Sequence, residues 1–181
     1  MRVIAGKYKG RVLLSPEGKG VRPTSDRIKE TLFNILQRYN TEGRVLDLFC
    51  GSGALGIEAL SRGASDVVFV DESRESCRLA QANLDKLRIG GDCAQIHNVD
   101  YIFALKKLQG AEFDIILADP PYNNMYEQNV LRLIDKYGLL KAGGAAVIEH
   151  SSDTEFGYDE SRFERDLRVY GKTALSFFSK I

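Results

Sequence analysis

Four consecutive residues, Asp119-Pro120-Pro121-Tyr122, follow a predicted buried strand at residues 113–118. A turn without chemistry would explain the two prolines, because X-Pro pairs often end strands. It would not explain the flanking carboxylate and aromatic ring. The exocyclic amine of a nucleobase is a poor nucleophile, since its lone pair is delocalised into the ring. Asp119 and the Pro120 carbonyl could accept its N–H hydrogens, Pro121 would keep the backbone rigid, and Tyr122 would offer a stacking face. The motif therefore favours transfer of a group to an amine.

A glycine-rich loop precedes this motif in the chain. Gly51, Gly53 and Gly56 have the G-x-G-x-x-G spacing, which lets the backbone approach a ligand and lets a helix pack closely on its strand. Asp71 comes 20 residues after Gly51, at the end of the next predicted strand, where a carboxylate can accept hydrogen bonds from ribose hydroxyls. This pattern fits a dinucleotide and equally another adenosine-containing cofactor.

Two further carboxylates distinguish between these cofactors. Asp47 lies beside the glycine loop, where it would repel a diphosphate and attract a sulfonium or ammonium group. Asp100 follows the third predicted strand, where it could meet the amine of an adenine. Either residue could instead cap a helix. Three carboxylates at strand ends together favour S-adenosylmethionine.

Charge is divided unevenly along the chain. Its 25 basic and 25 acidic residues give a net charge of zero, but residues 1–44 hold ten basic and four acidic groups, a balance of +6. Lys7, Lys9, Arg11 and Arg22 are candidate phosphate contacts, and Tyr8 could stack on a base. The alternative is a solvated edge strand that its lysines protect from aggregation. The asymmetry makes nucleic acid a candidate partner.

Composition narrows the class of protein. A chain of 181 residues with 44% hydrophobic and 28% charged residues is typical of one globular domain. Three cysteines (Cys50, Cys77, Cys93) without metal-type spacing argue against a disulfide scaffold and against a zinc site, so we expect no metal. No apolar run reaches the ~18 residues of a membrane helix, and no signal-peptide pattern follows Met1. We expect a cytoplasmic protein, with a monomer as the default.

Hydrophobic patterning predicts an α/β fold. Strands are expected at residues 45–49, 67–70, 94–97, 113–118 and 145–149, alternating with helices at 54–62, 73–87, 101–108 and 127–136. A closing antiparallel pair is expected at 162–170 and 173–179, which gives seven strands in a mainly parallel sheet with helices on both faces. Before them we expect a hairpin at 2–5 and 11–14 and a helix capped by Ser25 or Asp26. We divide the chain into a basic extension (1–43) that docks RNA and a catalytic domain (44–181).

Segments over nearly the whole chain resemble the RsmD family, the bacterial 16S rRNA guanine-N2 methyltransferases. The resemblance is carried by residues 2–14, Arg22-Pro23-Thr24, Lys29-Glu30, Leu32-Phe33-Asn34, residues 46–63, the Asp119 motif and Val169-Tyr170-Gly171. It implies a Rossmann-like class I methyltransferase fold and S-adenosylmethionine-dependent methylation of one guanine of 16S rRNA, in an assembling small subunit. It also implies that Thr24, Lys29 and Glu30 order the arm over the cofactor. DNA adenine methyltransferases share the Asp-Pro-Pro-Tyr motif, so the basic arm is the more discriminating part.

Three other functions remain open from the sequence. Another amino-methyltransferase, acting on DNA adenine or protein glutamine, would need a recognition domain for which 181 residues leave little room. A nicotinamide oxidoreductase would use the glycine loop and leave the Asp119 motif unexplained. A non-catalytic RNA-binding assembly factor would have no use for an intact motif. For the methyltransferase, Tyr126 and residues 123–125 are candidates for the wall of the target-base pocket.

Overall fold

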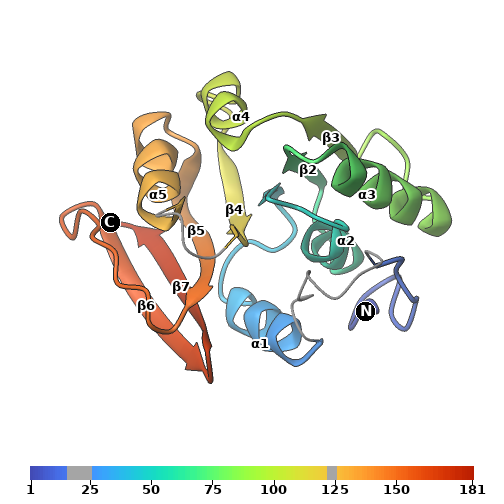
Figure 1. Cartoon of the computed structure of the whole chain (residues 1–181), viewed down its shortest axis with the longest axis horizontal. Coiled ribbons are helices and arrows are strands. Elements are labelled where there is room, and N and C mark those ends of the chain that lie inside the picture. The colour runs from blue at the N-terminus through green and yellow to red at the C-terminus, as the bar shows by residue number, and fades with distance from the viewer. Residues whose placement is uncertain (16–25, 122–125) are drawn as a thin grey trace.

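A seven-stranded sheet lies between two layers of helices in the computed structural model, which describes residues 1–15, 26–121 and 126–181 (Figure 1). In chain order the elements are α1 (Asp26–Leu36), β1 (Arg44–Leu48), α2 (Ala54–Ser61), β2 (Asp66–Asp71), α3 (Arg74–Leu87), β3 (Ala94–Asn98), α4 (Tyr101–Lys107), β4 (Phe113–Ala118), α5 (Tyr126–Lys136), β5 (Leu140–Ser151), β6 (Phe163–Tyr170) and β7 (Thr173–Lys180). The five predicted parallel strands, the four helices between them and the closing strand pair are confirmed, with boundaries that differ by a residue or two except at β5.

The strand order is β3-β2-β1-β4-β5-β7-β6. Strands β1 to β5 pair in parallel, and β7 runs antiparallel between β5 and β6. Because β1 has β2 on one side and β4 on the other, the chain reverses its winding direction at β1. Open α/β sheets bind ligands at the carboxyl ends of the strands beside such a switch point. The Rossmann-like, mainly parallel sheet expected from the sequence is therefore present, and its binding edge lies at the ends of β1 and β4.

Each face of the sheet has its own hydrophobic core. Helices α1, α2 and α3 pack on one face and α4 and α5 on the other. Adjacent strand residues alternate between the two cores, as Phe177 and Phe178 of β7 do. No helix in the described ranges is long and apolar enough to cross a membrane.

The N-terminal segment is packed against the first of these cores. Val3 and Leu13 are buried in the same cluster as Phe33 of α1. The expected hairpin is reduced to one antiparallel bridge, between Arg2 and Val12. Backbone hydrogen bonds join its two arms, from Val3 N–H to the carbonyl of Arg11 and from Leu13 N–H to the carbonyl of Met1, and other backbone groups of the segment bond to side chains of α2 and α3.

Strand β5 begins at Leu140, five residues before the predicted start at residue 145. Leu140 pairs with Phe113, whereas the next registered pair is Ile115 with Ala145. The extra residues form an irregularity that contains Gly143, with φ of 75°. Such a bulge interrupts the alternation of apolar residues, so the apolar pattern alone could not locate the start of the strand.

Candidate active site

Backbone hydrogen bonds fix the glycine loop, one to β2 and one within the loop itself. Cys50 N–H donates to the carbonyl of Val70 in β2 at 2.9 Å, and Gly53 N–H donates to the carbonyl of Cys50 at 2.7 Å. Gly53, with φ of 77°, is the N-cap of α2, and Phe49 also has a positive φ, of 65°. A left-handed phenylalanine is uncommon and stores strain that often marks a functional turn. A Cβ on Gly51 would meet no atom of the described residues within 4 Å, so these residues leave the crest of the loop open to a ligand.

Asp47 lies beneath this loop, with 2% of its surface exposed. Its Oδ2 accepts a hydrogen bond of 2.8 Å from Gly56 N–H, near the start of α2. Burial, opposed by this hydrogen bond and reinforced by the charge of Asp71, raises the pKa of Asp47 to about 7. The structure thus places the carboxylate beside the loop as expected, but behind the backbone and only partly ionised at neutral pH.

Asp71 and Asp100 both line a pocket at the carboxyl edge. Asp71 Oδ2 accepts from Gly51 N–H at 2.9 Å and its Oδ1 from Ser73 N–H at 2.8 Å, so the carboxylate ties β2 to the glycine loop. Asp100 caps α4: its Oδ1 accepts from Ile102 N–H at 2.8 Å. The capping role considered for Asp100 is therefore present, and it leaves Oδ2 without a hydrogen bond from the described residues. A role of either carboxylate with a cofactor stays a prediction.

The acidic motif begins beside the glycine loop. Asp119 N–H donates to the carbonyl of Leu48, the last residue of β1, at 3.4 Å. Asp119 is half-buried, Pro120 buried and Pro121 exposed. Pro121 lines the same pocket as Asp71 and Asp100. Tyr122 lies outside the described residues.

Three aromatic rings form one side of the pocket, and two of them were not expected from the sequence. Phe49, Tyr101 and Tyr126 all line it, with ring centroids 5.2 to 5.7 Å apart. Asn129 Nδ2 donates to the Tyr101 hydroxyl at 2.7 Å, which fixes that ring from α5. The sequence suggested Tyr126 for the wall of the target-base pocket; it lines the pocket of Asp71 and Asp100, and its role toward a target base stays a prediction. Tyr101, which directly follows Asp100, could have been found by the same strand-end argument. The flat apolar faces and nearby carboxylates suit an adenosine.

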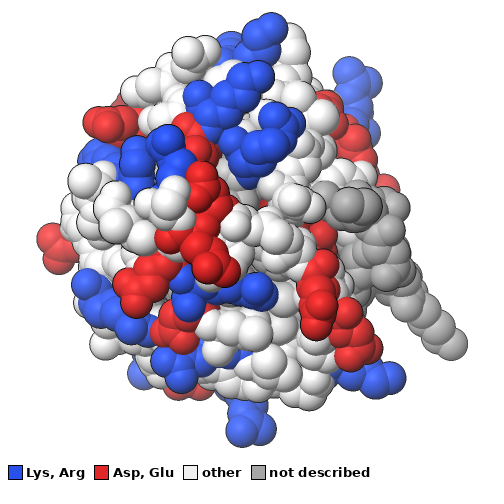
Figure 2. Space-filling view, turned by 90° about the vertical axis from the view of Figure 1, so that its left-hand side faces the viewer, with Lys and Arg blue, Asp and Glu red and all other residues white. Residues whose placement is uncertain are grey.

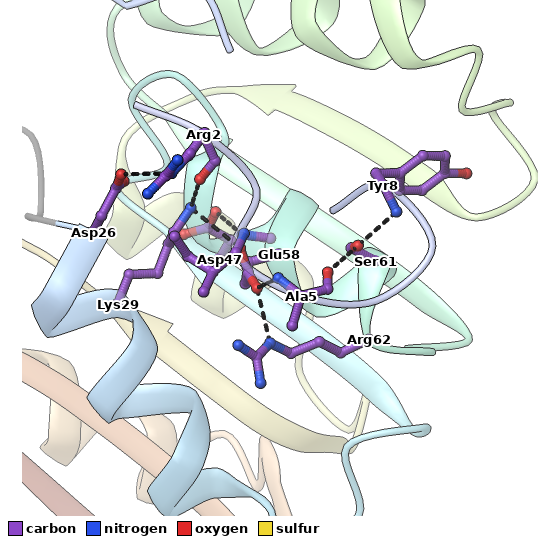
Figure 3. A network of polar contacts seen from close by, with 11 residues as sticks. Arg2, Ala5, Tyr8, Asp26, Lys29, Asp47, Glu58, Ser61 and Arg62 are labelled. Carbon is purple, nitrogen blue, oxygen red and sulfur yellow. Dashed lines mark hydrogen bonds and ion pairs between the residues drawn. The ribbon is translucent and has the colours of Figure 1, made fainter. Parts of the chain in front are cut away.

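A buried carboxylate fastens the N-terminal segment to the catalytic domain (Figure 3). Glu58 of α2 accepts hydrogen bonds from Ile4 N–H at 2.8 Å and Ala5 N–H at 3.0 Å. Glu58 forms ion pairs with Arg62 and with Lys29 of α1, whose Nζ lies 3.2 Å from Glu58 Oε2. The side chains of Lys29 and Glu58 are both fully buried. Lys29 Nζ also donates to the carbonyl of Arg2 at 2.6 Å. Lys29 thus holds the N-terminal segment against α2. The ordering of the arm over a cofactor, which the RsmD resemblance implied for Thr24, Lys29 and Glu30, stays a prediction, and Thr24 lies outside the described residues.

Further contacts continue along α2 and α3. Tyr8 N–H donates to Ser61 Oγ at 2.9 Å, and Figure 3 shows the Tyr8 ring pointing away from this network. At the other end of the segment, Asn83 of α3 bonds the backbone of Leu14 twice and also donates to the carbonyl of Ser52 in the glycine loop at 2.9 Å. The segment therefore extends from the glycine loop along the length of α2.

The candidate phosphate contacts on this segment are free of ion pairs. Lys7, Lys9 and Arg11 are exposed, and none has a carboxylate partner in the part of the chain that the structure describes. Lys7 Nζ lies 5.3 Å from the centroid of the Tyr8 ring. Arg22 lies outside the described residues. The other side of the molecule, which carries β6 and α5, shows Lys and Arg interleaved with a band of acidic side chains (Figure 2).

Cysteine and metal chemistry find no support in this geometry. Burial, followed by the charges of Asp47 and Asp71, raises the pKa of the Cys50 thiol well above its ordinary value. Such a thiol is a poor nucleophile, which agrees with a packing role. Within residues 1–15, 26–121 and 126–181, no group of three His, Cys, Asp or Glu side chains could hold a metal ion.

Comparison with known families and proteins gives matches over most of the chain. Residues 1–179 match the family model described as "Conserved hypothetical protein 95". The chain is 38% identical over 183 residues to "Putative rRNA methyltransferase YlbH" of Bacillus subtilis, covering 99% of each protein. It is 36% identical over 154 residues to "Ribosomal RNA small subunit methyltransferase D" of Haemophilus influenzae, covering 84% of this chain and 80% of the relative.

A solved structure has the same architecture. "Putative methyltransferase yhhF from Escherichia coli" superimposes with a TM-score of 0.87 at 30% sequence identity, covering 99% of this chain and 97% of the other. The N-terminal segment is therefore included in the similarity, along with the sheet.

Proposed function

The chain belongs to the family described as Conserved hypothetical protein 95, and we propose that it uses S-adenosylmethionine to methylate N2 of one guanine of 16S rRNA in an assembling small ribosomal subunit. The observation that carries the proposal is that Pro121, of the amine-binding motif, lines the same pocket as Asp71 and Asp100. The methyl donor and the amine would therefore meet at the switch point between β1 and β4. The names of the relatives support rRNA as substrate, and the RsmD resemblance supports N2 of guanine.

The residues present fit the cofactor. Asp71 would accept hydrogen bonds from ribose hydroxyls, Asp100 Oδ2 has capacity for the adenine amine, and Tyr101 offers an apolar face to the purine. The open crest at Gly51 leaves room for the donor's amino-acid part. The bound cofactor supplies an electrophilic methyl group on a sulfonium.

The protein's contribution to the reaction is positioning and electrostatics. Asp119 and the Pro120 carbonyl accept the two N–H hydrogens of the guanine amine, so that the nitrogen lone pair is directed at the methyl group in line with the departing sulfur. When bound, S-adenosylmethionine would give up its methyl group with the C–S bond breaking as the N–C bond forms, and S-adenosylhomocysteine would be the leaving group. The methylated nitrogen is transiently cationic and acidic, and its proton passes to Asp119 or to water. Asp119 therefore does not need to be a strong base.

The N-terminal hairpin would supply affinity for the RNA backbone. Its cations Lys7, Lys9 and Arg11 lack ion-pair partners in the described ranges. Tyr8 N–H donates a hydrogen bond to Ser61, the last residue of α2, whereas the pocket lies near the glycine loop that precedes the first residue of α2. Since α2 has eight residues, a substrate touching both must extend over at least ~12 Å. Folded RNA has that reach, and a single nucleotide does not.

Transfer of label tests the reaction. The protein is incubated with methyl-labelled S-adenosylmethionine and, separately, with small subunits, 16S rRNA, DNA or release factor, and the digested product is identified. We expect N2-methylguanine from the ribosomal substrates. Asp119→Asn should lower the rate by at least about 100-fold with unchanged cofactor affinity, whereas Asp92→Asn, at an exposed carboxylate, should leave it unchanged. Label in adenine or glutamine, or none in RNA, would overturn the proposal.

Salt dependence tests the hairpin. Replacing Lys7, Lys9 and Arg11 with glutamine should reduce the slope of log Kobs against log salt for rRNA binding by about 2 to 3. Because the three side chains are exposed, the free energy of unfolding should stay the same. An unchanged slope would mean that the hairpin does not contact phosphates.

A further inference from the structure

Helix α4 presents an apolar and basic outer face. Phe103 is 60% exposed and Ile102 44% exposed. Lys106 and Lys107 follow Phe103 by three and four positions, so they lie on the same side of the helix one turn later. A single exposed phenylalanine is ordinary for a protein surface. An exposed ring adjoining a second large apolar side chain and two lysines is a defined surface, here called the α4 face (Ile102, Phe103, Lys106, Lys107).

The charge of this face is not neutralised within the chain. Neither lysine has an ion-pair partner among the residues whose placement is described. The carboxylate at the start of α4, Asp100, directs Oδ1 to the helix backbone. His97, near the carboxyl end of β3, has its pKa lowered by burial and then by the charge of Lys107. Lys107 therefore acts close to the ligand-binding edge.

The α4 face adjoins the candidate active site. Asp100 and Tyr101 line the pocket, and Phe103 follows them by two residues. Helix α4 packs on one face of the sheet, while α2 and its attached hairpin pack on the other. Among the described residues, unpaired cations thus lie on both helical layers: Lys106 and Lys107 follow the pocket residue Tyr101 on α4, and the hairpin cations lie at the far end of α2.

We propose that the α4 face is a second RNA-binding surface, which stacks a base of the substrate on Phe103 and contacts phosphates through Lys106 and Lys107. This inference rests on the proposed function. An RNA strand that places one nucleotide in the pocket continues past it, and α4 adjoins the pocket on the face of the sheet opposite the hairpin. Aromatic stacking together with lysine–phosphate contacts is the combination that binds unpaired nucleotides irrespective of sequence. A protein partner would use the ring without needing unpaired cations.

Binding of a 16S rRNA transcript and of small subunits, measured against salt concentration, tests this surface. Lys106→Gln with Lys107→Gln should reduce the slope of log Kobs against log salt by about 1.4 to 1.8. Phe103→Ala should weaken binding about 5- to 150-fold with an unchanged slope, and Phe103→Tyr should retain wild-type affinity. The control pair Lys86→Gln with Lys180→Gln, in the last turn of α3 and at the end of β7, should keep affinity and slope near wild type.

The outcomes separate this proposal from the function on which it rests. If the wild type methylates no rRNA guanine, the proposed function fails. If the wild type methylates rRNA while the α4 variants match it in affinity and slope, only the α4 proposal fails. If Phe103→Ala weakens binding to subunits but not to protein-free rRNA, the face contacts a ribosomal protein, and the proposal is also overturned. Equal urea midpoints for all variants would show that none of these effects comes from unfolding.

Discussion

Asp47→Asn should stabilise the cofactor-free protein more at pH 8 than at pH 5. Asp47 is buried and its pKa is raised from 3.8 to about 7, so the wild type must hold a carboxylate ionised in the core above neutral pH. Asparagine is nearly isosteric and can accept the same hydrogen bond from Gly56 N–H. The variant therefore removes the buried charge and keeps the contact that supports the glycine loop.

The size of the effect follows from proton linkage. Because the folded state binds this proton more tightly than the unfolded state, stability decreases as pH rises from 3.8 towards 7, and this contribution is constant well above pH 7. At 1.36 kcal/mol per pKa unit, the loss between pH 5 and pH 8 is about 2 to 3 kcal/mol. The asparagine side chain of the variant does not titrate, so the free-energy difference between variant and wild type should increase by that amount over this range.

Urea unfolding of both proteins at pH 5, 6, 7 and 8 measures this difference directly. Other titrating groups contribute equally to the two proteins and cancel, provided that the substitution leaves them unperturbed. Asp92→Asn, at an exposed carboxylate, is the matched control and should give a difference that does not vary with pH. A constant difference for Asp47→Asn would refute the raised pKa. A loss of stability at every pH would show that the loop cannot pack around an amide NH2 in place of the second carboxyl oxygen of Asp47.

The same carboxylate should make cofactor binding depend on pH. A cationic donor favours the ionised form, so binding is linked to release of a proton. With a pKa of about 7, the ionised fraction rises about fivefold between pH 6 and pH 7, and wild-type affinity for S-adenosylmethionine should rise with it. Isothermal titration should show that dependence in the wild type and not in Asp47→Asn. A pH-independent wild-type affinity would mean that Asp47 does not act on the cofactor's charge.

Two further substitutions examine how the N-terminal segment is attached. Gly6→Ala would place a Cβ against a backbone carbonyl of α2, whereas Gly10, with a similar φ of 81°, has open space; Gly10→Ala should cost about 1 kcal/mol in urea unfolding. Gly6→Ala should lower the free energy of unfolding clearly more than that and weaken RNA binding. Equal losses of stability for the two variants would contradict the close contact of Gly6 with Ser61 of α2. Lys29→Met leaves the buried carboxylate of Glu58 without its ammonium partner and should destabilise by about 3 to 5 kcal/mol. Adding Glu58→Gln should recover part of that loss, and strictly additive losses would rule out coupling.

The elements and the binding edge of this protein follow from sequence because they depend on local patterns. Apolar runs of strand length, helical periodicity and Gly63 after α2 are properties of neighbouring residues. The same logic places Asp71, Asp100 and Asp119 at one edge, since parallel strands end together. None of this requires knowledge of how distant segments pack.

The details that the sequence could not provide depend on such packing. Glu58 has the pattern of a polar residue on a surface helix, but it is buried because the N-terminal backbone covers it and donates to it. The partly ionised state of Asp47 depends on how completely α2 covers β1. The ring cluster at the pocket joins a loop to α4 and α5, and Phe49 takes part only because it adopts a positive φ.

Part of the positive charge of the N-terminal part of the chain is neutralised by carboxylates of the rest of the chain. Among the described residues of 1–44, four cations form ion pairs, three of them with carboxylates that lie beyond residue 44; they are Arg2, Lys29, Arg38 and Arg44. The +6 of residues 1–44 is therefore partly neutralised on folding. The cations that stay unpaired in the described part of this segment include the three on the hairpin, where a polyanion could replace water and counterions. Within the described part of residues 1–44, ion pairing thus neutralises cations at the junction that holds the hairpin and leaves the hairpin cations available to attract RNA.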